Sequence, residues 1–255
     1  MTVTETPIAI PYPDAEQLHL RLSIGPARLR IVPGDGDTWV SGTYYDESGS
    51  IPLRISTEGG VARISQTNRI LGVLKETPRF DLRLGKARPF ALTIEAGATD
   101  DSACDLGGIP LTEIDVKYGA GEVRLDFSAP NPQPMTRLRL AAGAAETELL
   151  NLANSGAEEI SVDGGAATFL LDFGGELRRD LRARLNTGMA TVEIRIPSAM
   201  AAKVAPRTML GSLDPGSGFV TRDGEFWTMA AVAGDTPSLT IDARVALGTL
   251  KLRAT

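Results

Sequence analysis

The stretch from Ile114 to Phe127, IDVKYGAGEVRLDF, decides the fold of this chain. Apolar and polar residues alternate on both sides of a Gly-Ala-Gly corner, which is the two-residue period of a β-strand and not the period of a helix. Glycine favours a sharp corner because it lacks a Cβ and allows positive φ and close backbone approach. The stretch therefore predicts two short strands joined by a bend.

Variants of this unit recur along the chain, with corner glycines at positions 97, 119, 143, 165 and 188. The spacings are 22, 24, 22 and 23 residues, and a fixed period in this range indicates a repeat architecture. A degenerate copy surrounds Gly211, and the last copy runs from Ile241 to Leu252. We predict an all-β fold, a single-stranded right-handed β-solenoid (β-helix) with an antiparallel β-sheet cap at its amino terminus.

A single repeat is too small to fold by itself. Its roughly five inward side chains contribute about 1.5–3 kcal/mol each when buried, whereas ordering the backbone costs about 1–2 kcal/mol for every residue. Neighbouring rungs must therefore stack and share a core. Stacking in register places Asp115 beside Arg139 and Arg124 beside Glu148 on the outer surface, where such pairs contribute about 0–1 kcal/mol.

The chain divides into three predicted segments. Residues 1–67 read as strands separated by Gly-containing turns, which we interpret as the cap, and residues 68–78 as a connecting loop. Residues 79–255 carry the solenoid repeats, with an insertion at 214–238. We expect residues 239–255 to close the stack, with a position beside the amino-terminal strands as one possibility.

Two groups of apolar residues are candidates for binding a protein partner. The connecting loop carries an apolar patch that either folds over the core or contacts another protein, formed by Ile70, Leu71, Val73 and Leu74. The insertion carries Phe226 and Trp227 after an Asp223-Gly224 turn. This turn predicts a hairpin that packs its aromatic rings on the end of the solenoid or presents them to a partner.

The residues that carry chemistry are sparse. His19 is the only histidine and Cys104 the only cysteine, so a Ser-His-Asp triad would have to use His19, and neither a disulfide nor a thiolate zinc site can form. Asp100, Asp101 and Asp105 are more typical of a polar turn than of a calcium site. We predict no catalytic residue, cofactor or metal, and not an enzyme.

Composition limits the possible partners. The chain of 255 residues has a net charge of −6, which disfavours nucleic acid. No run of 18 apolar residues predicts a transmembrane segment, and the amino terminus has neither the basic start nor the apolar core of a signal peptide. We therefore expect a cytoplasmic location.

The pattern also resembles a known family. The segment RFDLRL at Arg79–Leu84 and the segment DLGG at Asp105–Gly108 are similar to motifs of the toast-rack, LiaF-like family of bacterial β-solenoid domains, whose repeats are adhesin-head-like. The corner pattern is eroded at Pro26, Thr99 and Met189 among other positions. The resemblance implies a β-solenoid, and its relatives are often fused to membrane helices and linked to envelope-stress signalling.

Three functions follow from these observations. We favour a structural or scaffolding domain that self-associates as a homo-oligomer or docks a protein partner through an edge or an end, since a terminal rung has open hydrogen-bonding groups. A soluble regulator of envelope-stress signalling is implied by the resemblance alone. A carbohydrate-binding or carbohydrate-active protein would need paired outward carboxylates, and here these alternate with arginines.

Overall fold

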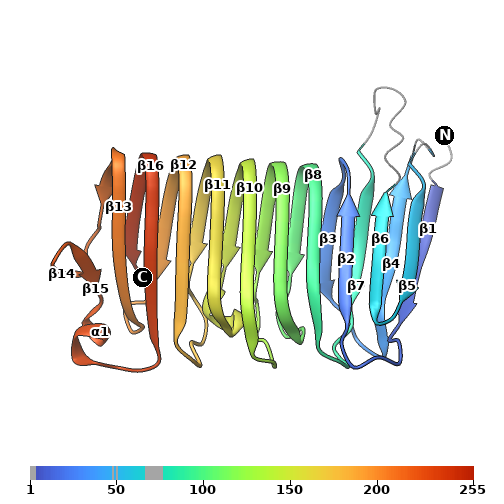
Figure 1. Cartoon of the computed structure of the whole chain (residues 1–255), viewed down its shortest axis with the longest axis horizontal. Coiled ribbons are helices and arrows are strands. Elements are labelled where there is room, and N and C mark those ends of the chain that lie inside the picture. The colour runs from blue at the N-terminus through green and yellow to red at the C-terminus, as the bar shows by residue number, and fades with distance from the viewer. Residues whose placement is uncertain (1–3, 48, 50, 67–76) are drawn as a thin grey trace.

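The computed structural model describes residues 4–47, 49, 51–66 and 77–255. Its strands lie side by side along the long axis of the molecule, as Figure 1 shows. Within the described residues they form one 16-stranded sheet that contains both parallel and antiparallel pairs. The all-β prediction is confirmed.

Five long strands make the centre of the stack. They are β8 (Phe90–Asp105), β9 (Leu111–Asp126), β10 (Met135–Leu150), β11 (Ala157–Asp172) and β12 (Leu181–Ile196). Each ascends on one side of the molecule, bends over the top edge and descends behind (Figure 1). Each pairs in parallel with the next on both sides of its bend, as from Glu113↔Arg137 to Asp126↔Leu150. One strand is therefore one rung with two arms, which confirms the solenoid prediction.

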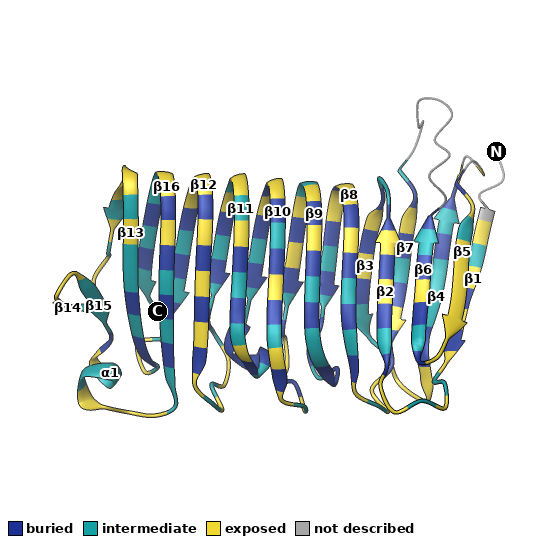
Figure 2. Cartoon of the chain, in the orientation of Figure 1, coloured by how far each residue is buried: buried dark blue, intermediate teal, exposed yellow. Residues whose placement is uncertain are grey.

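The core lies between the two arms. In β9, Ile114 and Val116 before the bend and Val123 and Leu125 after it are at most 3% exposed, and Phe127 is fully buried. These residues hold alternate positions of the strand, so the intervening side chains face solvent. The banding of buried and exposed residues along each rung is visible in Figure 2. The alternation in the sequence is thus the division between core and surface.

The corner glycines lie in one line along the top edge. A Cβ at Gly119 would lie 2.4 Å from the carbonyl oxygen of Gly97, and a Cβ at Gly143 would lie 2.4 Å from that of Gly119. Gly165 follows on Gly143 in the same way, at 2.8 Å. At these three corners the backbones of successive rungs approach too closely for a side chain, which explains why glycine recurs there.

The amino-terminal rungs do not follow the order of the chain. Their strands are β2 (His19–Ile24), β3 (Arg28–Pro33), β6 (Val61–Gln66) and β7 (Arg79–Leu84). β2 pairs in parallel with β8 and β6, and β3 pairs in parallel with β8 and β7. The rung formed by β2 and β3 is therefore inserted between β8 and the rung formed by β6 and β7.

Antiparallel strands cover the outer side of this end. They are β1 (Thr4–Pro11), β4 (Thr38–Asp46) and β5 (Leu53–Glu58). β4 pairs with β7, β1 with β4, and β5 with β6, all antiparallel, which confirms the predicted cap. The division into domains stays a prediction, and the parallel ladder already includes β2, β3 and β6, which precede residue 67.

The carboxyl-terminal end differs from the expectation. β16 (Ser238–Ala254) lies between β12 and β13 (Ala201–Asp214) and pairs in parallel with both. Residues 239–255 therefore do not close the stack, and the amino-terminal strands lie at its opposite end (Figure 1). β16 has alternating buried residues on both arms, whereas β13 has no buried residue after Val204, so β13 is less suited to an internal position. The insertion between them gives the chain enough length to return toward β12.

The lower edge is held by buried asparagine side chains. Asn131 is 5% exposed, and its Nδ2 donates to the carbonyl oxygens of Leu111 at 2.8 Å and Ser155 at 3.0 Å. Asn154, in the short 3-10 helix η1 (Leu152–Ser155), donates from Nδ2 to the carbonyl oxygen of Phe127 at 2.9 Å. These contacts join the turns of successive rungs, since buried backbone groups need partners.

Candidate docking surface

The outer edge of β13 is only partly covered. β15 (Glu225–Trp227) pairs antiparallel with β13 at Lys203 and Val204. Thr228 extends this cover, because its backbone N–H donates to the carbonyl oxygen of Ala202 at 3.0 Å and its hydroxyl accepts from the Ala202 N–H at 2.9 Å. Among the described strands, none pairs with this edge from Ala205 to Asp214.

The covering element is the predicted hairpin. β14 (Val220–Arg222) and β15 are joined by Asp223 and Gly224, with φ of 49° and 79°. Positive φ at both central residues is the conformation of a type I′ turn, for which Asp-Gly is a preferred sequence. A short helix that the sequence did not predict, α1 (Met229–Ala233), follows the hairpin.

The structure places the predicted partner-binding aromatic residues against the molecule's own end. Phe226 packs on the core and meets Phe219 edge to face, with 6.4 Å between ring centroids. Lys203 and Arg222 lie over the Trp227 ring, with Nζ and Cζ at 5.5 and 5.7 Å from its centroid. Their role toward a partner stays a prediction. The other predicted set, Ile70, Leu71, Val73 and Leu74, lies outside the described residues.

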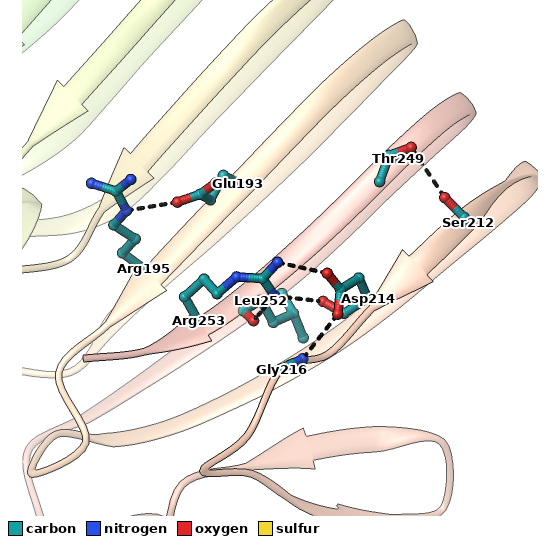
Figure 3. A network of polar contacts seen from close by, with 8 residues as sticks. All are labelled: Glu193, Arg195, Ser212, Asp214, Gly216, Thr249, Leu252 and Arg253. Carbon is teal, nitrogen blue, oxygen red and sulfur yellow. Dashed lines mark hydrogen bonds and ion pairs between the residues drawn. The ribbon is translucent and has the colours of Figure 1, made fainter.

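The descending arm of β13 is tied to β16 by polar contacts, which Figure 3 shows. Arg253 Nη2 bonds to Asp214 Oδ2 at 2.6 Å. The hydrogen bond from Arg253 lowers the pKa of the Asp214 carboxyl group, and the same bond raises the pKa of Arg253. The hydroxyls of Ser212 and Thr249 lie 3.0 Å apart. The terminal rung is thus held in register although one of its sides is open.

Four large apolar side chains are exposed at the bends of the last three rungs. Met189 is 61% exposed, Leu247 43%, Leu210 74% and Met209 82%. The sequence signal for them was weak, because only Met189 stood out as a departure from the corner pattern. A lone apolar residue at a bend does not show which residues from other rungs will lie beside it.

A groove of about 970 Å³ runs along the glycine edge. Its floor includes Gly97, Gly119 and Gly143. The groove is open because these glycines have no side chains to fill the space above them. On its rim, Lys117 Nζ lies 3.2 Å from Glu95 Oε1. The rim charges are therefore engaged with each other across neighbouring rungs.

A second hollow of about 850 Å³ lies on the outer face beside His19. His19 Nε2 is 2.8 Å from Thr93 Oγ1. Burial lowers the pKa of His19, and the positive charge of Arg21 lowers it further. This favours the neutral imidazole, which is held by a threonine and not by the carboxylate that a triad would require.

The remaining candidate groups are buried or paired. Cys104 is buried, and burial raises the pKa of its thiol to about 12, so it carries no thiolate at neutral pH. Outward carboxylates meet arginines of the adjacent rung, with Glu148 Oε2 at 2.8 Å from Arg124 Nη1 and Glu159 Oε1 at 2.6 Å from Arg184 Nη1. This arrangement serves register and leaves these carboxylates no free proton-transfer role.

The described residues contain no group of three or more His, Cys, Asp or Glu side chains placed to hold a metal ion. Their helices are too short to form a membrane span.

Together these features define a class of protein: an all-β stack of parallel rungs, capped at the amino-terminal end and partly open at the carboxyl-terminal end. A family model described as the N-terminal domain of toast_rack, DUF2154, matches residues 2–133, so this chain belongs to the toast-rack family. The resemblance seen in the sequence is confirmed.

Two solved structures are similar to this chain to different degrees, and only the first, with a TM-score above 0.5, shows a shared fold. A "putative cell adhesion protein" from Clostridium sporogenes is 16% identical, with a TM-score of 0.56 and all of both chains covered. A "putative adhesin" from Bacteroides fragilis is 10% identical, with a TM-score of 0.48, and the match covers 98% of this chain and 97% of that one. At such identities the likeness concerns the fold alone. No curated protein matches the sequence significantly.

Proposed function

We propose that this chain is a non-enzymatic scaffold that self-associates, or docks a protein partner, by strand addition at its carboxyl-terminal end. The observation that carries the proposal is the outer edge of β13, which has no described partner strand from Ala205 to Asp214. An edge of this kind has unpaired N–H and C=O groups that another strand can satisfy.

The two ends of the stack are unequal, which favours β13 over β1 as the contact. β1 is an edge strand that contains Pro7 and Pro11, and proline disfavours further pairing because it has no N–H. In β13, Pro206 and the cover over Lys203 and Val204 protect the ascending arm. The descending arm is left for a second copy, whose identical β13 would meet this one across a two-fold axis.

The state of the reactive side chains supports a non-enzymatic role. Cys104 is buried with a raised pKa, and the neutral His19 is bonded to Thr93. A nucleophile needs a base within hydrogen-bond reach that is itself oriented by a third group. In the described part of the chain Cys104 has no such base, and His19 lies within reach of the Thr93 hydroxyl but has no carboxylate bonded to it that would orient the ring.

Light scattering after size exclusion tests the proposal. We expect a mass above the 27.0 kDa of one chain that rises with protein concentration. Ser212→Lys places a charge on the uncovered edge and should return the mass toward one chain, because edge lysines oppose strand pairing. Ser217→Lys, in the exposed loop after β13, is the matched control and should leave the mass unchanged.

Two outcomes would count against it. A mass of 27.0 kDa at every concentration would refute self-association. A Ser212→Lys variant that associates as the unaltered chain does would show that the contact lies away from β13.

A further inference from the structure

The exposed apolar side chains at the bends form one column. Met189 on β12 pairs in register with Leu247 on β16, and Leu247 pairs with Leu210 on β13. Met209 adjoins Leu210 in the chain, and we call these four residues the apolar ridge. The ridge lies at the bends of the last three rungs, where Figure 2 shows exposed residues on the top edge.

The fold does not require large side chains at these positions. Ala166 holds the same register position as Met189 one rung earlier, and Ala98, Ala120 and Ala144 align with one another at the corresponding place in β8 to β10. An exposed methionine or leucine contributes little to core burial. The change from alanine to large apolar residues is therefore confined to one end of the stack and is unnecessary for stacking.

Two arginines stand beside the ridge. Arg244 and Arg207 precede Leu247 and Leu210 by three residues and face each other across β16 and β13. Both are exposed, and within the described residues no carboxylate lies at ion-pair distance from either. Like charges that face each other across a ladder are destabilising, and Arg21 and Arg63 form a similar pair at the other end of the molecule. What distinguishes Arg207 and Arg244 is their position beside the apolar ridge.

Hydroxyl groups line the opposite flank of the ridge. Thr191, Thr249 and Ser212 face one another in register, and the last two are hydrogen-bonded, as Figure 3 shows. The surface thus has an apolar crest with a basic row on one side and a hydrogen-bonding row on the other. It is convex, because it follows the bends of the rungs.

The convex shape and small size of this surface favour a fluid partner, such as a bilayer, over a rigid protein partner. A standard protein interface uses about 20–30 residues on each side, whereas the crest has four apolar residues. A bilayer adapts to a convex ridge, takes up its apolar tips between headgroups and attracts adjacent arginines to anionic phosphates. We propose that the apolar ridge docks reversibly on a bilayer surface that contains anionic phospholipids, with Arg207 and Arg244 contacting the phosphate groups.

This inference goes beyond the proposed self-association, because strand addition uses the backbone edge that faces along the stack and the ridge uses side chains at the bends. Co-sedimentation with vesicles tests it, with vesicles of phosphatidylcholine alone compared with vesicles that also contain phosphatidylglycerol. We expect binding to the anionic vesicles that falls as salt is added and little binding to the neutral ones.

Paired variants identify the residues responsible. Arg207→Gln with Arg244→Gln should lower the partition onto anionic vesicles by roughly 30-fold. The matched control is Arg21→Gln with Arg63→Gln, another exposed pair that faces across a ladder, at the other end of the molecule. The control pair should retain binding although it changes the net charge equally.

The apolar contribution has its own test. Met209→Ser with Leu210→Ser should lower the partition by roughly tenfold, whereas Ile55→Ser, which alters a 40% exposed residue on β5, should not. Equal binding to both kinds of vesicle, no binding, or equal losses in the control variants would overturn the proposal. A change in solution mass for the ridge variants, measured by light scattering without vesicles, would assign the ridge to a protein contact instead.

Discussion

Alanine substitutions at the corner glycines can distinguish the effect of close backbone approach on stability from the effect of backbone conformation. Gly97, Gly119, Gly143, Gly165 and Gly188 hold equivalent corners, and each has φ outside the left-handed region, so alanine is conformationally allowed at all of them. Their surroundings differ in a graded way. A Cβ would meet a carbonyl oxygen at 2.4 Å from Gly119 or Gly143, at 2.8 Å from Gly165 and at 3.2 Å from Gly188, but its nearest neighbour from Gly97 is 3.9 Å away.

The expected magnitudes follow from these distances. At Gly97 alanine fits, and it should stabilise the chain by about 0.4–1 kcal/mol because it restricts the unfolded state. At Gly143 the contact is with backbone, which cannot rotate away, and overpacking of this kind costs about 1–3 kcal/mol. The free energies of unfolding should therefore rank Gly97→Ala highest, followed by Gly188→Ala, Gly165→Ala and Gly143→Ala.

Thermal and urea unfolding followed by circular dichroism measure this ranking. A loss of 1 kcal/mol lowers the Tm by about 2–4 °C for a domain near this size. Equal stabilities for Gly97→Ala and Gly143→Ala would refute the argument that the period arises from contact between neighbouring rungs. An increase in stability at Gly143 would refute it more directly, since conformational entropy alone would then explain the series.

Three further measurements test the core, the lower edge and the outer face. Asn131→Ala leaves buried backbone groups of neighbouring turns unpaired, at about 1–3 kcal/mol for each group, and should lower the unfolding midpoint. Asn131→Asp should lower it at least as much, because a carboxylate cannot donate to the carbonyl oxygens of Leu111 and Ser155; an unchanged midpoint in Asn131→Asp would contradict the hydrogen-bond account. Burial raises the pKa of Cys104 to about 12, so its thiol should react with a modifying reagent at mildly alkaline pH only after unfolding, and rapid labelling of the native chain would refute its placement. The pKa of His19 is lowered from 6.5, so the unfolded chain takes up a proton first and stability should fall as the pH drops below that value. His19→Gln should flatten this part of the stability profile, and an unaltered profile would assign it to other groups.

The repeat was predictable because each of its causes is local. Strand alternation and the corner glycine are visible in the sequence of one unit, and the spacing is visible from one unit to the next. Register followed from the spacing, so the predicted neighbours Asp115↔Arg139 and Arg124↔Glu148 are confirmed by the strand pairing. Each rung is related to the next by a translation that brings equivalent residues together, so the neighbours of a residue in adjacent rungs can be predicted from the repeat spacing.

The docking surface was less predictable because it depends on contacts between distant segments. The sequence directed attention to Phe226 and Trp227, and the structure packs Phe226 on the core and places Trp227 between two basic side chains. It did not indicate Leu210 or Leu247, which are separated by the whole insertion and meet only through the ladder. Isolated apolar residues at bends carry no signal of their neighbours.

By itself the sequence determined a β-solenoid with a glycine-lined edge, an alternating core and the register of its central rungs. Similar units bury their apolar residues and pair their backbones together only when they stack in register. The order of the rungs at both ends was decided by tertiary structure alone. β16 lies between β12 and β13, and the rung of β2 and β3 lies between β8 and the rung of β6 and β7. The weak alternation of β13 disfavours an internal position for it but does not identify the strand that pairs with β12 instead. This order leaves β13 as the edge strand and brings Met189, Leu247 and Leu210 side by side. The physical reason is that the pairing of all strands at this end, and not the pattern of any single strand, sets which strand is terminal.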